Sequence, residues 1–117
     1  MPTPIFEPGD VIKVPFPYVE KPVKQYRPAL VVSSSELQEV HSLLWVLMIT
    51  SAENKPWAGD VEVSHLEEAG LPVPSVVRCA KIATIEASAA TRIGALAQAQ
   101  FKLVSNMIQR ALGSNPA

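Results

Sequence analysis

The polar residues best suited to chemistry lie beside two apolar segments of the sequence. Arg27 lies just before the run Ala29–Val32, and Thr50 and Ser51 follow the run Leu43–Ile49. An arginine beside a hydroxyl suits a phosphate group, because the planar guanidinium donates to two phosphate oxygens and stays charged. If the two segments form neighbouring strands, their ends bring these side chains together. Such residues are common at protein surfaces, so the pattern alone does not define a site.

Other catalytic and metal-binding motifs are absent from the sequence. His41 and His65 are isolated, and there is neither a Gly-x-Ser-x-Gly elbow nor a glycine-rich phosphate loop. A Ser-His-Asp arrangement stays open, because sequence order does not exclude one. The one cysteine, Cys79, lies in an apolar segment, which favours a small buried hydrophobe over a nucleophile. We therefore expect no metal, no cofactor and no intrachain disulfide.

Short strands followed by one helix must position these residues. The chain has 117 residues, with 10 Lys and Arg, 11 Asp and Glu, and 11 prolines, none of them between Val76 and Asn115. Proline is disfavoured inside helices and central strands, so a long helix is expected only near the end. The near-zero net charge excludes a protein that binds nucleic acid mainly through bulk positive charge. Any such site must be a local basic groove.

Apolar patterning predicts six short strands. They are Val11–Phe16, Ala29–Val32, Leu43–Thr50, Val61–Val63, Val76–Ile85 and Thr91–Leu96. Pro15 makes the first an edge strand, because proline donates no ladder hydrogen bond. The third strand is apolar on both faces and is expected to be central. The serines at 33–35 could cap a helical turn that begins near Glu36.

The end of the chain predicts an amphipathic helix closed by Gly113. Its apolar residues recur at helical spacing: Ala97, Phe101, Val104, Ile108 and Ala111. Strands followed by one helix are typical of a small curled β-barrel capped by a helix. We expect one domain over residues 1–117, with a core of about 7–112. There is neither a membrane-span-length apolar run nor a signal peptide, which indicates a soluble cytoplasmic protein.

An ordered set of motifs adds a family resemblance. The motifs are Gly9-Asp10, Arg27-Pro28-Ala29-Leu30-Val31, Ile49-Thr50-Ser51, the segment Val76–Ile85 and Ile93-Gly94-Ala95-Leu96. Together they resemble the MazF/PemK family, the ribonuclease toxins of bacterial toxin–antitoxin pairs, over roughly Glu7 to Leu112. The resemblance implies a mainly β fold with a C-terminal helix, an SH3-like barrel of the MazF/PemK/CcdB kind, and a homodimer. It also implies metal-independent cleavage of single-stranded RNA and a cognate antitoxin that neutralises the toxin.

The resemblance also implies roles for individual residues. Arg27 matches the catalytic arginine of the family and Thr50 its catalytic threonine. The implied reaction is attack of the ribose 2′-OH on the adjacent phosphorus, giving a 2′,3′-cyclic phosphate and a 5′-OH end. The candidate RNA-binding residues are Lys24, Ser51, Lys55, Lys81 and Tyr18, with Tyr26 and Trp57 as further aromatic side chains that could stack on bases.

The sequence departs from the family pattern in its acidic residues. Ala80 stands where many relatives carry Asp, Pro15 where Asp is frequent, and Glu20 is the only acid in the loop before Arg27. No general base is therefore assigned. One alternative is an inactive relative that only binds antitoxin or RNA. A second is a non-enzymatic toxin of the same fold that binds DNA gyrase through the end of its C-terminal helix.

An antitoxin of this kind is expected to lay a disordered acidic tail along the basic groove. The groove would contain Lys21, Lys24, Arg27, Lys55 and Lys81. The tail would then compete with RNA near Arg27.

Overall fold

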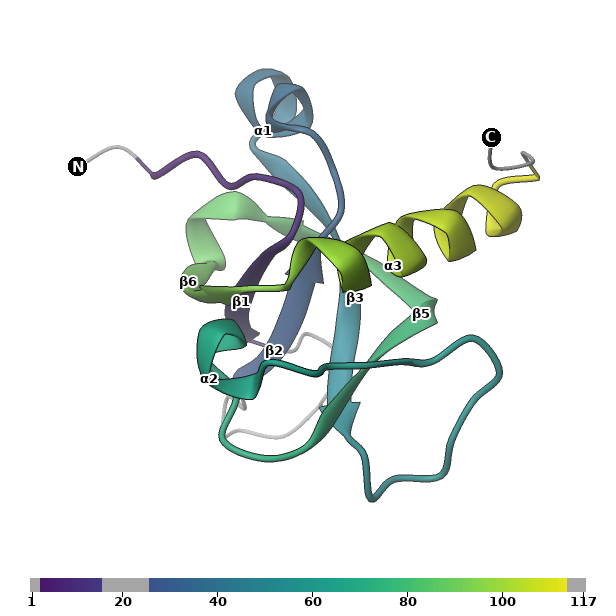
Figure 1. The fold of residues 1–117 in the computed structure, drawn as a ribbon. Helices are drawn as coiled ribbons and strands as arrows, with labels where there is room; N and C mark the ends of the chain where they lie inside the picture. Colours follow the sequence, from purple (N-terminus) through teal and green to yellow (C-terminus); the bar gives the residue numbers. More distant parts are fainter. Residues whose placement is uncertain (1–2, 16–25, 114–117) are drawn as a thin grey trace.

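A curled antiparallel sheet followed by a C-terminal helix forms the frame of the molecule (Figure 1). The computed structural model describes residues 3–15 and 26–113. The elements are β1 (Asp10–Pro15), β2 (Tyr26–Val31), α1 (Ser35–His41), β3 (Leu43–Ser51), β4 (Val61–Glu62), α2 (Leu66–Ala69), β5 (Ser75–Glu86), η1 (Ala87–Ala89), β6 (Thr91–Ala95) and α3 (Gln98–Ala111). The strands form a six-stranded sheet in the order β4-β5-β3-β2-β1-β6.

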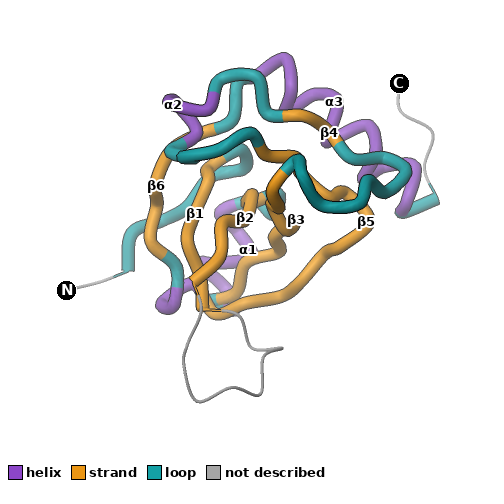
Figure 2. The backbone as a smooth tube through the Cα atoms, turned by 90° about the horizontal axis from the view of Figure 1, so that it is seen from below, coloured by secondary structure: helices purple, strands orange, loops and turns teal. Residues whose placement is uncertain are grey.

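The sheet curves into a half-barrel whose open side is covered by α2 and α3 (Figure 2). A large bulge in β5 contributes to this curvature. Its register with β3 passes from Arg78 opposite Met48 to Ile82 opposite Leu47, which leaves residues 79–81 without partners on β3. Because extra residues in one strand bend it and increase its twist, β5 curves at residues 79–81 and still pairs with β3 on both sides of them.

Both faces of the sheet are buried, and alternate residues of each strand point to opposite faces. One cluster, which we call the helix face, contains Val11, Leu30, Leu47, Ile49, Val77 and Val104 of α3. The second cluster, which we call the far face, contains Phe6, Ile12, Val14, Ala29, Val46 and Met48. The strongly apolar β3 contributes to both clusters, which explains why the sequence pattern of this strand does not alternate.

The N-terminal segment is fastened to the far face by the buried side chain of Gln38 in α1. Its Oε1 accepts a hydrogen bond from the Phe6 amide at 2.8 Å, and its Nε2 donates to the Pro4 carbonyl at 2.8 Å. These two bonds replace the strand partner that the segment lacks. They hold Phe6 in the core, where its side chain is buried.

The motif Ile93-Gly94 is explained by close packing between β6 and α2. A Cβ on Gly94 would collide with the backbone of Ala69, and a Cβ on Gly70 would collide with the carbonyl of Ile93. Gly70 also has φ +73°, a conformation that favours glycine. The two glycines therefore let α2 lie directly against β6 and cover one side of the half-barrel.

The structure confirms the mainly β architecture, the central position of β3 between β2 and β5, and the late amphipathic helix. Gly113 follows α3 with φ +85° and donates its amide to the Arg110 carbonyl, as expected of a residue that ends a helix. The short helices α2 and η1 lie between predicted strands, where no helix was predicted. Among the described residues, no helix is long and apolar enough to cross a membrane.

Two local predictions were wrong. The first strand is not an edge strand, because β1 lies between β2 and β6. Pro15 is tolerated there because it pairs with Tyr26 of β2 on one side only. On the other side β6 pairs with Asp10 to Lys13 and not with Pro15, so this end of β1 is locally an edge. The serines do not cap α1 either. Ser34 at its N-cap makes no side-chain bond, and the Ser33 hydroxyl instead accepts a hydrogen bond from the Trp45 amide at 3.0 Å.

Candidate functional site

Arg27 and Thr50 lie at the ends of two neighbouring strands. In the register of β2 and β3, Ala29 pairs with Met48, and continuing this register by two residues sets Arg27 opposite Thr50. Both side chains project to the far face, since alternation matches them with Ala29 and Met48. On the other side of β2, Arg27 pairs with Val14 of β1. By this continued register the two residues belong to one row across the sheet, with Arg27 exposed and Thr50 half-buried.

A tight turn after β3 fixes the hydroxyl of Thr50. Asn54 donates its side-chain amide to Thr50 Oγ1, and the Asn54 backbone amide donates to the carbonyl of Ser51 at 3.1 Å. Ser51 itself pairs with Ser75 and lies on the helix face, and its hydroxyl accepts a hydrogen bond from the Glu53 amide at 3.3 Å. Thr50 therefore points toward the same face as Arg27, whereas Ser51 points away from it.

The remaining candidate residues lie at different places. Lys55 is exposed in the loop between β3 and β4. Lys81 is exposed in the bulge of β5, beyond Arg78 and away from the strand end that carries Thr50. Lys24 and Tyr18 lie outside the described residues. The groove expected from the sequence is therefore represented here by Arg27 and Lys55 near the strand ends and by Lys81 further along β5.

A buried ion pair beside Thr50 was not anticipated from the sequence. Arg78 donates from Nε to Oδ1 of Asp60 at 3.2 Å and from Nη2 to Oδ2 at 3.1 Å, and both side chains are 10% exposed. Nη2 also donates to the carbonyl of Lys55 at 2.9 Å. The guanidinium lies over the ring of Trp57, with its Cζ 4.4 Å from the ring centroid. The available signal was an arginine inside an apolar strand, which requires a partner when buried.

This Arg78 cluster (Arg78, Asp60, Trp57 and the Lys55 carbonyl) shapes the acid–base behaviour nearby. Desolvation raises the pKa of Asp60, but hydrogen bonds from Arg78 and the Trp57 amide, with the charge of Arg78, outweigh it and lower that pKa below its usual value. Burial, together with the negative charge of Asp60, raises the pKa of the Cys79 thiol to about 11. Cys79 is buried and reduced, as expected of a small core residue rather than a nucleophile.

Two of the candidate aromatic side chains are described, and they differ in position. Tyr26 is exposed and lies under the ammonium of Lys13, whose Nζ is 5.8 Å from the ring centroid. By strand alternation Tyr26 points to the face opposite Arg27. Trp57 instead lies against Arg78, whose side chain points to the same face as Met48 and Thr50. Of these two side chains, Trp57 is therefore the one associated with the Arg27 side of the sheet.

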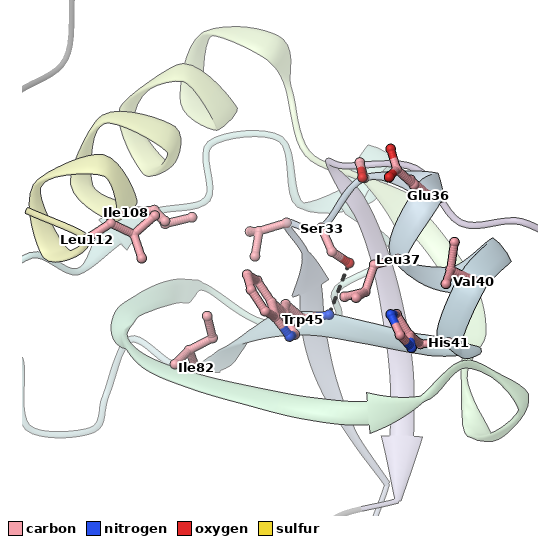
Figure 3. Close-up of a pocket in the computed structure, with 11 residues that line it drawn as sticks. Ser33, Glu36, Leu37, Val40, His41, Trp45, Ile82, Ile108 and Leu112 are labelled. Carbon is pink, nitrogen blue, oxygen red and sulfur yellow. Dashed lines mark hydrogen bonds between the residues drawn. The ribbon is translucent and has the colours of Figure 1, made fainter. Parts of the chain in front are cut away.

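A separate apolar groove of about 500 Å³ lies between α1, the start of β3, β5 and the end of α3 (Figure 3). Trp45, Val40 and Ile82 line it together with Ile108 and Leu112 of α3. Among the described residues that line it there is no lysine or arginine, the side chains best suited to binding phosphate. Trp45 is also five residues along β3 from Thr50, roughly 16 Å in a strand. Within the part of the chain that the structure describes, no group of His, Cys, Asp and Glu residues could hold a metal ion.

The fold is shared with known toxins. A chain of the MazE–MazF crystal structure from Deinococcus radiodurans is 21% identical, with a TM-score of 0.74 over 95% of this chain and 98% of that one. An endoribonuclease in complex with its cognate antitoxin, from a mycobacterial species, is 17% identical, with a TM-score of 0.73 over 100% of both chains. The toxin MazF-mt6 of Mycobacterium tuberculosis is 24% identical, with a TM-score of 0.68 over 90% of this chain and 98% of that one. At these identities the similarity establishes the fold.

The family is established by a separate comparison. Residues 7–112 match the family described as PemK-like, MazF-like toxin of type II toxin–antitoxin system. Because this match spans most of the chain, the chain belongs to that family, and the resemblance found in the sequence motifs is confirmed. The comparison with curated protein sequences gave no match.

Proposed function

We propose that this chain is a toxin-type endoribonuclease that cleaves single-stranded RNA, including mRNA, at short sequences without a metal ion. The observation that carries the proposal is the β2–β3 register, whose continuation sets Arg27 opposite Thr50 on one face of the sheet. A guanidinium beside a hydroxyl at an accessible sheet end suits a phosphodiester. Membership of a toxin family, and a fold shared with a protein described as an endoribonuclease, support the same activity.

The proposed reaction is an internal transesterification. The ribose 2′-oxygen loses its proton and bonds to the adjacent phosphorus, while the bond from phosphorus to the 5′-oxygen breaks and that oxygen takes up a proton. The products are a 2′,3′-cyclic phosphate and a 5′-OH end. Negative charge builds on the non-bridging oxygens in the transition state, where a preorganised guanidinium is most effective. We assign this stabilisation to Arg27 and the orientation of the phosphate to Thr50.

We infer that the flanking residues hold the RNA strand on either side of this phosphate. Lys24, Lys55 and Lys81 would contact neighbouring phosphates, and Tyr18 would stack on a base. Ser51 would assist indirectly, because its hydroxyl accepts from the Glu53 amide in the turn whose Asn54 holds the Thr50 hydroxyl. The partners we propose are a cognate antitoxin and a second copy of the chain in a homodimer. Because the proposed substrate is mRNA, we place the activity in the cytoplasm.

The proposal is tested by RNA cleavage in EDTA with purified wild type, Arg27→Ala and Arg27→Lys. We expect Arg27→Ala to lower kcat/KM by at least about 100-fold, as loss of one transition-state donor typically does. Arg27→Lys keeps the charge but loses the planar fork, so it should restore only part of the activity.

The matched control is Arg110→Ala, an exposed arginine in the last turn of α3. It should cleave like the wild type, because α3 covers the helix face whereas Arg27 points to the far face. Wild-type protein that binds RNA without cleaving it would indicate the inactive relative instead. Cleavage that persists in Arg27→Ala would refute the assignment of this residue.

A further inference from the structure

Trp57 is held rigidly although a large part of its side chain is exposed. Its indole lies against the Arg78 guanidinium, 4.4 Å from Cζ to the ring centroid, yet Trp57 as a whole remains 45% exposed. The contact covers part of one ring face by a cation–π interaction. An aromatic ring that is held against a neighbour and still largely exposed offers a surface on which a nucleobase can stack.

The guanidinium that supports the ring is itself locked in place. Arg78 donates two hydrogen bonds to Asp60 and one to the carbonyl of Lys55, and the pair is nine-tenths buried. Asp60 in turn accepts a hydrogen bond from the backbone amide of Trp57 at 3.0 Å. The loop between β3 and β4 is therefore fixed to Arg78 of β5 by the Asp60 carboxylate, the Lys55 carbonyl and the Trp57 ring, and the Trp57 amide is held within the loop by Asp60.

The stack lies beside the proposed phosphate site. Arg78 pairs with Met48, and Thr50 is two residues further along β3 on the same face, so the two form a diagonal pair. Cα atoms in such a pair are roughly 7–8 Å apart. Asn54, in the loop that carries Trp57, also donates a hydrogen bond to Thr50 Oγ1. The loop that carries Trp57 is therefore anchored near the proposed phosphate site at two points, by the bond from Asn54 to Thr50 and by the stack of Trp57 on Arg78.

We propose that Trp57 is a base-stacking residue of the RNA site and that Arg78 and Asp60 are positioning residues that hold its ring. This inference rests on the proposed ribonuclease function and adds the residue that receives a base next to the scissile phosphate. In a single strand the base is joined to its phosphate through one sugar, so its receptor must lie beside the phosphate site and not within it. Trp57 meets this condition because its loop is bonded to Thr50 through Asn54 and its ring stacks on Arg78, the diagonal neighbour of Thr50.

The chain contains two tryptophans, which allows a direct spectroscopic test. Trp45→Phe leaves Trp57 as the sole indole, and Trp57→Phe leaves Trp45 in the apolar groove as the matched control. The probe is a short single-stranded RNA with 2′-deoxyribose at the cleaved position, which lacks the attacking hydroxyl and so binds without reacting. We expect RNA to quench the emission of Trp57 and to leave that of Trp45 unchanged.

Kinetics on cleavable RNA provide the second readout. Trp57→Ala should raise KM about 10-fold, within the range for loss of one base stack, and should lower kcat far less. Trp57→Phe should keep most of the wild-type KM because a phenyl ring still stacks. Arg78→Lys, which loses the two-nitrogen contact with Asp60, should raise KM in the same direction.

The outcomes separate this inference from the proposed function. RNA cleavage by the wild type, with no quenching of Trp57 and an unchanged KM in Trp57→Ala, would overturn the stacking role and leave the ribonuclease activity standing. A wild-type protein that neither binds nor cleaves RNA would overturn both. Equal quenching of Trp45 and Trp57 would also refute the inference, because it would indicate contact that is not specific to this loop.

Discussion

At the scale of single residues, two arginines on one face of the sheet differ in their surroundings. Arg78 is buried, and its charge is matched by the carboxylate of Asp60. Arg27 is exposed at the end of β2. A buried arginine organises the protein around it, whereas an exposed one at a strand end is accessible to a phosphate. The same residue type is therefore structural at one position and suited to catalysis at the other.

The environment of Cys79 leads to a prediction about its reactivity. Burial raises the pKa of this thiol from 9.0 to about 11, which lowers its thiolate fraction at pH 8 about 100-fold. Native protein should therefore react with Ellman's reagent at least about 100-fold more slowly than protein unfolded in urea. Because the charge of Asp60 contributes to the raised pKa, Asp60→Asn should react faster than the wild type when both are folded. Equal rates for native and unfolded protein would contradict the burial of this thiol.

At the scale of elements, the strands and the late helix follow from the apolar pattern, because each must bury a particular face. The approach of Arg27 to Thr50 could also be anticipated, since antiparallel neighbours bring opposite strand ends together. The partner of Arg78 could not. Asp60 lies 18 positions earlier in the sequence, and its distance from Arg78 depends on the path of a loop and on a bulge that no residue pattern specifies. The prediction that Pro15 marks an edge strand was wrong for a similar reason. The length of β6, which the sequence pattern does not specify, decides whether the missing amide of Pro15 faces a neighbouring strand.

The ion pair between Arg78 and Asp60 should make the stability of the molecule sensitive to acid. Since the pKa of Asp60 is lowered in the folded state, the unfolded chain binds a proton at higher pH than the folded one. The stabilisation is thus fully present above the unfolded pKa, near 4, and is lost as pH falls through the lower folded pKa.

Asp60→Asn checks this sign. At pH 7 the variant should lose about 3 kcal/mol of unfolding free energy, as expected when a buried arginine loses its charged partner. The difference from the wild type should narrow steadily as urea unfolding is repeated at lower pH, from 5 toward 3. A difference that stays constant with pH would show that Asp60 does not act through its charge.

At the scale of the whole molecule, the two faces of the sheet have separate surroundings. The helix face is covered by α2 and α3, and the apolar groove opens beside the end of α3 (Figure 3). Arg27, Thr50 and the Arg78 cluster belong to the far face. A partner that carries negative charge, as RNA does, would therefore bind at a different part of the molecule from a partner that presents an apolar surface.

The proposed antitoxin should compete with RNA if its acidic tail covers the Arg27 side. We expect a peptide of that tail to displace fluorescent RNA from the wild type, with an apparent affinity that falls as salt rises. Arg27→Ala should weaken binding of both the peptide and the RNA, whereas Arg110→Ala should weaken neither. Formation of a ternary complex, with RNA and peptide bound together at full affinity, would exclude a shared site.

The most direct test of the central claim is the chemistry of the RNA ends that the wild type produces in EDTA. Attack by the 2′-hydroxyl predicts 5′-OH ends, which polynucleotide kinase labels without prior phosphatase treatment, and 2′,3′-cyclic phosphates on the other fragments. It also predicts that 2′-deoxyribose at the cleaved position abolishes cleavage. Products with 5′-phosphate and 3′-OH ends, or cleavage of the 2′-deoxy substrate at the wild-type rate, would contradict the account.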